Sequence, residues 1–298
     1  MSSDFAGFVN HFVLLFQILL LFYYKYLTLS NTHLNQSTIY LIEPTDASLV
    51  PSSSSKGWLI KVQESKNQSL SLVSPISDRK LLYPPSSCDN SSLMLLSLLD
   101  YRVIEICKSY TIEKITRFAS YVRKLVFYPN SPWTNVKDCV SFCIFEEGKL
   151  GFMKHGDQNW KLVVDKNFYY DDVIVFKGQF YVTDKWGAIS WIDVCSLKLI
   201  QFSPPFCGFG NKKHLVESCG SLYVVDGYYE SENMRRNYAG RQRDRDDAVE
   251  SFKIYKLDEE WGTWIDVKNL SDRAFILSKS CNFSVSTKEL MGYKGNCR

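Results

Sequence analysis

The chain has 298 residues, of which 45% are hydrophobic and 22% are charged, as in an ordinary folded globular protein. It contains a single long uncharged run, which excludes a membrane protein with several spans, and a net charge of +3 is too small to indicate a nucleic-acid partner. Aromatic residues make up 15% of the chain and recur beside short runs of Val, Ile and Leu. This mixture favours β-strands over a helical bundle.

The first part of the chain is strongly apolar. Residues 5–24 carry no charge, and from Phe12 to Tyr24 the run is apolar apart from Gln17. A helix of twenty residues spans about 30 Å, the thickness of the bilayer hydrocarbon core. No basic stretch precedes the run and no clear small-residue cleavage site follows it, so a signal peptide fits less well. We therefore predict one hydrophobic helix in residues 1–28, a candidate membrane anchor, with a helix buried in protein as the alternative.

Residues 29–56 are rich in Ser, Asn, Thr and Pro and end near the serine run Ser52–Ser55. This composition is typical of a linker. We therefore predict that the folded domain occupies residues 57–298.

The centre of this domain has the pattern of a β-meander. Short strands are predicted at 172–176, 179–183, 188–193 and 197–202, separated by turn residues such as Lys177-Gly178. Four antiparallel strands in about thirty residues have the size of one blade of a β-propeller.

The same pattern recurs on either side. Gly148, Gly178 and Gly220 each begin a similar strand at a hairpin turn (GKLGF, GQFYV, GSLYV), and Asp184 and Asp226 close the second and third of these strands. We expect positive φ angles at Gly178 and Gly220. Repetition of this kind predicts an all-β propeller rather than a β-sandwich, the alternative architecture.

Counting the repeated units predicts about six four-stranded blades. The last blade begins near Ala274 and is incomplete. The polar stretch 230–247 is predicted to be a surface loop inserted between two strands of one blade.

Several segments taken together resemble a known family. GWLIKV, GDQNW, YYDDVIVFKGQFYVTD, KKHLVESCGSLYVVD and FKIYKLDEEWGTWIDVKNLSDRAFIL occur in this order, followed by CNFSVSTKE and GYKGNC. The chain is similar to the plant F-box-associated β-propeller family of the KIB type. That resemblance implies a propeller that selects substrates for a cullin–RING ubiquitin ligase, reached through an F-box that docks on a Skp1-type adaptor. It also implies a nuclear or cytoplasmic location.

Two features depart from the family pattern. The F-box pattern, roughly W-x-x-L-P followed by amphipathic helices, is absent, and the apolar segment stands in its place. Family members also continue past the GNC motif, whereas this sequence stops at Arg298, so we expect a short final blade. We further expect that the chain as written does not bind a Skp1-type adaptor.

The nine cysteines include no C-x-x-C motif, and the prediction is that they are small buried hydrophobes in a reducing compartment. Cys139 and Cys143, the closest pair, share a strand face about 13 Å apart, too far to bind one metal ion. Five N-x-S/T motifs weakly favour a secretory route instead; they begin at Asn35, Asn67, Asn90, Asn269 and Asn282.

No motif for catalysis stands out. His155 and Asp157 are read as turn residues and His214 as a satisfied histidine at the start of a strand, although it could face a ligand. The adjacent carboxylates lie at turns or strand starts and are read as solvated turn charges; they make poor acid–base pairs, because neighbours on a strand point to opposite faces. The Gly-rich stretch 208–213 lacks the P-loop pattern. The adjacent carboxylates are Asp171-Asp172, Glu146-Glu147 and Glu259-Glu260.

The five arginines between Arg235 and Arg245 are balanced by acidic neighbours and indicate a solubilising insertion rather than a nucleic-acid arm.

We accordingly predict no catalytic, cofactor-binding or metal-binding residues and no enzyme activity. The predicted function is a non-catalytic propeller that binds an unknown protein at one rim, with no nucleic-acid partner and with membrane contact through residues 5–24 as an option. The alternative is a membrane-anchored or secreted propeller acting as a carbohydrate-binding protein or hydrolase.

Overall fold

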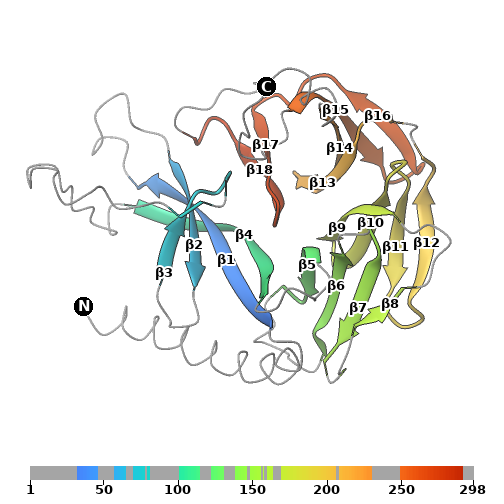
Figure 1. Cartoon of the computed structure of the whole chain (residues 1–298). Helices are drawn as coiled ribbons and strands as arrows, with labels where there is room; N and C mark the ends of the chain where they lie inside the picture. Colours follow the sequence, from blue (N-terminus) through green and yellow to red (C-terminus); the bar gives the residue numbers. More distant parts are fainter. Residues whose placement is uncertain are drawn as a thin grey trace, which may run out of the picture.

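The computed structural model of this chain describes thirteen stretches, which together form eighteen β-strands in five antiparallel sheets arranged as a ring (Figure 1). The described residues are 32–45, 57–64, 70–77, 79–80, 101–114, 122–130, 138–145, 148–155, 157, 160–163, 169–205, 208–229 and 249–290. These stretches contain no helix, and the all-β propeller predicted from the sequence is confirmed. The predicted hydrophobic helix in residues 1–28 lies outside them.

In the part of the chain that the structure covers, we find no helix with the length and hydropathy needed to cross a membrane.

The five sheets are called A, C, D, E and F below. Sheet D contains the four strands that the sequence predicted best. They run as a meander in which each strand pairs with the next. The strands are β9 (Tyr170–Phe176), β10 (Gln179–Asp184), β11 (Ile189–Asp193) and β12 (Lys198–Ser203). Every boundary lies within two residues of its predicted position.

Two of the hairpins have turns that only a few residue types adopt easily. Lys177 and Gly178 have φ angles of 48° and 76°, and Cys219 and Gly220 have 50° and 72°. Two consecutive positive φ angles define a type I′ turn, whose twist matches that of the flanking strands. The predicted positive φ angles at Gly178 and Gly220 are therefore confirmed.

Sheet E is a second meander. Its strands are β13 (Lys212–Ser218), β14 (Ser221–Tyr229), β15 (Val249–Asp258) and β16 (Thr263–Val267). Tyr229 pairs with Val249, so the ends of the segment predicted as an inserted loop lie side by side between two strands of one sheet. Residues 230–248 themselves lie outside the described residues.

Sheets C and A complete the four-stranded sheets. Sheet C contains β5 (Val122–Tyr128), β6 (Val140–Phe145), β7 (Leu150–Lys154) and β8 (Lys161–Leu162). Sheet A has the order β3-β2-β1-β4; the strands are β1 (Thr32–Pro44), β2 (Trp58–Glu64), β3 (Leu70–Val73) and β4 (Tyr101–Lys114).

Strand β1 corrects the predicted domain boundary. It lies in the stretch 29–56 that was read as a linker, and it pairs with both β2 and β4. Its polar residues concealed its role, because only alternate positions such as Ile39 and Leu41 contribute to the apolar core. The folded domain therefore includes residues from Thr32 onward, rather than starting at Gly57.

The predicted number of blades is also corrected. Beside the four four-stranded sheets, the described residues form one two-stranded sheet, sheet F, from β17 (Arg273–Leu277) and β18 (Asn282–Ser286). The sequence count of about six was too high because β1–β3 and β4 belong to one sheet, although a long stretch of chain separates β3 from β4.

Apolar side chains pack between neighbouring sheets. Sheets C and D share a cluster that includes Phe142, Phe152 and Phe180, and sheets D and E share one that includes Phe176 and Leu222. A third cluster joins sheet A to sheet C, and a fourth joins sheet A to sheet F. Sheets E and F meet through the edge-to-face rings of Tyr223 and Phe275, 5.2 Å apart. Each sheet thus contacts the next one around the ring.

Candidate functional site

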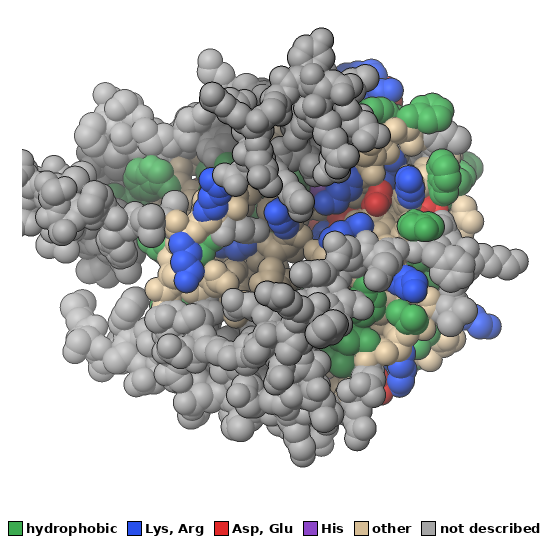
Figure 2. Space-filling model, in the orientation of Figure 1, with side chains coloured by type: hydrophobic (Ala, Val, Ile, Leu, Met, Phe, Trp, Pro, Cys, Tyr) green, Lys and Arg blue, Asp and Glu red, His purple; other side chains and the backbone are tan. Residues whose placement is uncertain are grey.

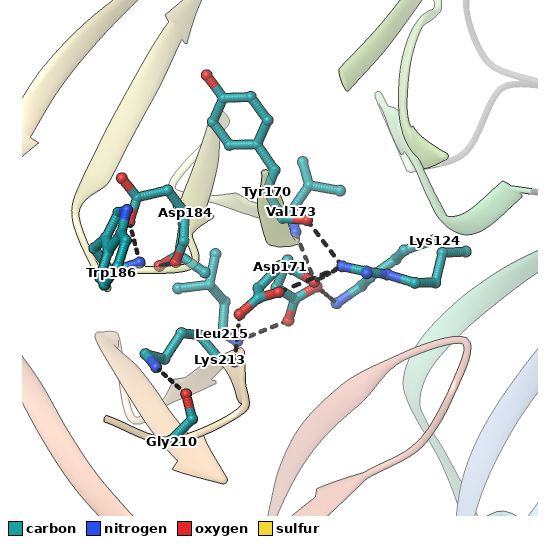
Figure 3. A network of polar contacts seen from close by, with 12 residues as sticks. Lys124, Tyr170, Asp171, Val173, Asp184, Trp186, Gly210, Lys213 and Leu215 are labelled. Atoms are coloured by element: carbon teal, nitrogen blue, oxygen red, sulfur yellow. Dashed lines mark hydrogen bonds and ion pairs between the residues drawn. The ribbon is translucent and has the colours of Figure 1, made fainter. Parts of the chain in front are cut away.

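One strand from each of four sheets brings polar side chains to the middle of the ring. Strand β9 contacts β5 on one side and β13 on the other, and β13 in turn contacts β18. The polar residues lie at or near the beginning of each of these strands. In Figure 3, Lys124 lies on one side of Asp171, and Lys213 and Leu215 lie on the other.

Asp172 is the centre of this network, and it is only 2% exposed. Its carboxylate forms an ion pair with Lys124 of β5 and accepts hydrogen bonds from the backbone N–H of Val173 (2.8 Å) and Leu215 (2.7 Å). It also accepts a hydrogen bond from the Asn282 side-chain amide at 2.8 Å. One buried carboxylate therefore joins sheets C, D, E and F.

Asp171 makes a second set of contacts between sheets. Its Oδ2 accepts a hydrogen bond from the backbone N–H of Lys213 at 2.9 Å, and its Oδ1 lies 3.7 Å from the Arg123 guanidinium. Arg123 also donates to the carbonyl oxygens of Tyr170 and Asp171. Burial raises the pKa of Asp171, although the Lys213 N–H and the Arg123 charge oppose the shift.

Two basic residues of β13, Lys212 and His214, lie near the charged groups of this network, and their pKa values are shifted by burial and by these charges. His214 is 5% exposed, and burial, aided by the charge of Lys212, lowers its pKa to about 3. Burial also lowers the pKa of Lys212, and the nearby Arg123 charge adds to this effect. His214 is therefore neutral at physiological pH, as expected of a buried histidine surrounded by cations.

Lys213 points to the other face of β13 and is completely buried. Its ammonium lies 2.7 Å from the equally buried Asp226 carboxylate and donates to the carbonyl oxygen of Gly210 at 2.9 Å. A Cβ at Gly210 would lie 2.1 Å from the Asp226 side chain, so only glycine fits there. The Gly-rich stretch 208–213 is thus packed around a buried ion pair and does not form a phosphate-binding loop.

Three exposed aromatic side chains lie at the end of the ring where β9 and β13 begin. Tyr169 is 63% exposed, Trp186 59% and Phe209 87%. The turn that carries Trp186 is held by Asp184, whose carboxylate accepts the backbone N–H groups of Trp186 and Ala188. The N–H of Lys185 donates to the carbonyl of Tyr169, so the chain segments that carry Tyr169 and Trp186 lie side by side. We call these three residues the aromatic face.

The structure corrects the reading of Asp171 and Asp172 as solvated turn charges. Asp172 is buried and Asp171 is partly buried in strand β9, because carboxylates that receive several N–H bonds and face cations can leave water at little cost. Glu259 and Glu260 do lie at an exposed turn, where Glu259 pairs with Lys177. Glu146 and Glu147 lie outside the described residues.

The remaining sequence candidates are placed apart from this network. Asp157 binds the Lys154 backbone and pairs with Lys161, and His155 lies in the turn after β7. Within the described residues, no group of three or more His, Cys, Asp or Glu side chains is suited to a metal ion.

The cysteine and glycosylation motifs can be placed in part. Cys139 and Cys143 are buried beside Leu125, and burial raises the pKa of both thiols. The Asn282 amide is occupied by its bonds to Asp172 and to the Leu215 carbonyl, so the folded chain cannot carry a glycan there.

Sequence reasoning missed Lys124 and Asn282, because each acquires its role only when distant strands meet. The chemistry of the central network is that of a structural junction. Its carboxylates accept hydrogen bonds and pair with cations, and the buried histidine stays neutral. A carboxylate held in this way is poorly placed to exchange protons with a substrate.

These features define a β-propeller whose centre is joined by carboxylates and which exposes aromatic side chains at one end. The family model described as KIB1-4 beta-propeller matches residues 28–297, and the chain belongs to this family. The resemblance noted in the sequence is therefore confirmed.

Its relatives in Arabidopsis thaliana are F-box proteins. The chain is 28% identical to F-box protein SKIP23 over 87% of its own length and 65% of that protein. It is 31% identical to F-box protein At2g26160, over 83% of this chain and 73% of the relative, and 30% identical to F-box protein At4g35733, over 80% and 64%. The chain thus spans about two thirds of the length of these relatives.

Proposed function

We propose that this protein is a non-catalytic interaction module that binds a protein partner through its aromatic face, and that the partner is a substrate for ubiquitylation. The observation that carries the proposal is that Tyr169, Trp186 and Phe209, all more than half exposed, lie at the same end of the ring. Large exposed aromatic side chains on one surface are typical of protein interfaces, where they supply much of the binding energy.

The electrostatics of the ring support the same function. Figure 2 shows Lys and Arg side chains gathered around the middle of one face. The carboxylates that might have served as acid and base, Asp171 and Asp172, are instead used to join sheets. The family relation to F-box proteins supports a role in substrate selection.

The experiment compares partner capture by three versions of the full chain. One is unmodified, one combines Tyr169→Ala, Trp186→Ala and Phe209→Ala, and the control carries Trp261→Ala. Trp261 is 73% exposed in the turn between β15 and β16, at the end of the ring where Lys177 pairs with Glu259. Proteins from a plant extract are crosslinked to each version and identified, and each partner is then purified for binding measurements.

We expect at least one partner whose dissociation constant rises about tenfold or more in the triple variant and stays unchanged in the control. The melting temperature of all three versions should agree, since the substituted side chains are exposed. If the triple variant bound every partner as tightly as the unmodified chain, the proposal that partners bind through the aromatic face would be refuted. A purified chain that hydrolyses a glycoside or binds a glycan, with no protein partner, would favour the alternative function.

The link to the ligase is tested separately. We propose that the chain as written does not dock a Skp1-type adaptor, because its sequence lacks the F-box pattern and the apolar run from Phe12 to Tyr24 has no polar face. A pull-down with the full chain is compared with the same propeller fused to a genuine F-box. Adaptor binding of equal strength by both would overturn this part of the proposal and give the chain a complete receptor role.

We also propose a nuclear or cytoplasmic location, following the family. A fluorescent fusion of the full chain is compared with one in which Leu19 and Leu20 are replaced by Lys. Membrane localisation of the first fusion, lost in the second, would instead identify residues 5–24 as an anchor.

A further inference from the structure

Two thiols meet where the first and last sheets of the ring join. The Cys107 side chain of β4 donates a hydrogen bond to the sulfur of Cys281, just before β18, and the two sulfur atoms are 3.8 Å apart. The residues are 174 positions apart in the chain, yet they face each other across the contact between sheets A and F. We call this contact the A–F seam.

The surroundings of Cys281 favour its thiolate form. The hydrogen bond from Cys107, together with the charge of Lys61, lowers the pKa of Cys281 against the opposing effect of burial. The same hydrogen bond and burial raise the pKa of Cys107. Lys61 is itself only 2% exposed and donates to the Ser280 hydroxyl at 3.0 Å, which fixes its ammonium beside Cys281. A thiolate beside a cation is the nucleophilic form of cysteine.

The other described cysteines lack this combination. Cys139 and Cys143 are buried beside apolar groups, and burial raises their pKa values. Cys195 and Cys219 are exposed. Cys195 and Cys219 therefore serve as internal controls. If exposure alone decided which thiol is oxidised, these two would react before Cys107 and Cys281.

We propose that Cys107 and Cys281 are a modification site for hydroperoxides, which convert the pair to a disulfide that closes the A–F seam covalently. The Cys281 thiolate attacks one peroxide oxygen; an S–O bond forms, the O–O bond breaks, and the leaving oxygen takes a proton to become water when the oxidant is hydrogen peroxide. The Cys107 sulfur then attacks the sulfenic sulfur, an S–S bond forms, and the S–O bond breaks with loss of a second water. In sum, two thiols and one hydrogen peroxide give one disulfide and two waters.

The geometry needs little adjustment for this reaction. The sulfur atoms must approach from 3.8 Å to about 2.05 Å, a movement of less than 2 Å. Neither residue is fully sealed from solvent, since Cys107 is partly exposed and Cys281 is 7% exposed. The resulting cross-link would close a loop of more than 170 residues and restrict the unfolded chain strongly.

The test uses the purified, reduced full chain treated with an equimolar amount of hydrogen peroxide. After free thiols are blocked, peptide mapping without reductant should reveal a Cys107–Cys281 peptide pair that is two hydrogen atoms lighter than the reduced peptides together. The melting temperature should rise by about 5 °C or more and return to its starting value with dithiothreitol.

Two variants separate this site from general oxidation. Cys195→Ser should form the cross-link and show the same temperature shift, whereas Cys107→Ser should show neither. If Cys107→Ser does not fold, the peptide map of the unmodified chain still decides the question. The proposal is overturned if Cys107 and Cys281 stay open to alkylation after Cys195 and Cys219 have been oxidised. It is equally overturned if Cys281 proceeds to the sulfinic acid without linking to Cys107.

Discussion

The polar network around Asp172, called the central junction below, and the A–F seam hold neighbouring sheets together by different means. At the central junction, the buried Asp172 carboxylate binds groups from β5, β9, β13 and β18. At the A–F seam, apolar side chains such as Leu41 and Phe283 pack together, accompanied by a lysine–serine hydrogen bond and a pair of thiols.

This difference determines what each region tolerates. A buried charge that receives several hydrogen bonds is costly to disturb, because its partners are left without a bond in a region that excludes water. An apolar contact loses stability in proportion to the area removed and leaves no charge unpaired. The central junction should therefore respond to charge and pH, and the seam to packing and thiol chemistry.

The largest expected effect comes from Asp172→Asn. This change removes the buried charge that pairs with the partly buried Lys124, and we expect the free energy of unfolding to fall by about 3–5 kcal/mol in a urea titration. The matched control is Asp266→Asn, which breaks an exposed ion pair with Lys268 and should cost about 0–1 kcal/mol. Equal losses in the two variants would show that the central junction contributes no more than a surface contact.

Acidification should weaken the central junction through His214. Its pKa is about 3 in the folded chain and 6.5 in the unfolded reference, so the unfolded state binds the extra proton between these values. The stabilisation is complete above pH 6.5 and declines as the pH falls toward 3. Between pH 7 and pH 5 the free energy of unfolding should drop by about 2 kcal/mol.

The pH effect is checked by urea unfolding at each pH and by the variant His214→Gln, which cannot titrate. The variant should lack most of the slope between pH 7 and pH 5. Measurements stay above pH 5 because the raised pKa of Asp171 acts in the opposite direction at lower pH. An unchanged slope in His214→Gln would assign the acid sensitivity to other groups.

The hairpin glycines should differ from each other. At both positions alanine would take a positive φ, which costs about 1–2 kcal/mol. A Cβ at Gly178 would also lie 3.1 Å from the Tyr128 hydroxyl of sheet C, whereas one at Gly220 meets nothing within 4 Å. We expect Gly178→Ala to be the more destabilising of the two in thermal melts, and a reversed order would contradict the described contact between sheets C and D.

At the A–F seam, Ser280→Ala should have a smaller effect. It removes the hydroxyl that accepts the Lys61 hydrogen bond, and we expect a loss of about 1 kcal/mol in urea unfolding. The result should lie well below that of Asp172→Asn. A loss as large as that of Asp172→Asn would show that the seam also depends on one polar group.

The smallest effect is expected from replacing residues 231–247 by a short Asn-Gly turn. Tyr229 and Val249 are already paired, so a tight connection can join β14 to β15. Closure of a long loop adds little cost, and the melting temperature should change by about 2 °C or less. A collapse of stability would show that this segment packs against the sheets.

The strands of sheet D could be predicted from sequence because their information is local. Lys177-Gly178 specifies a tight turn, and alternation of apolar residues specifies the strands on either side. Strand β1 was missed because its first half, THLNQST, is largely polar, and only one of its two partners, β2, follows closely, whereas β4 begins nearly sixty residues after β1 ends. Pairing over such a distance leaves no local signal.

The polar contacts at the centre were beyond sequence reasoning for the same reason. Asp172 and Asn282 are 110 positions apart, and Lys124 comes from a third sheet. An adjacent pair of aspartates at a strand start gives no sign of burial until the cations and N–H groups around it are known. Likewise, nine cysteines without spacing motifs cannot indicate that Cys107 meets Cys281.

The contact of Gly57 with Glu289 and Leu290, which follow β18, has a consequence for synthesis on the ribosome. The N–H of Gly57 donates to the Glu289 carbonyl at 2.6 Å, and Gly57 forms a parallel bridge with Leu290. At roughly 5–20 residues per second, more than ten seconds pass between translation of these two positions. During that interval, Ile39 and Leu41 have no sheet F to cover them. The nascent chain should therefore need a chaperone until its final strands emerge.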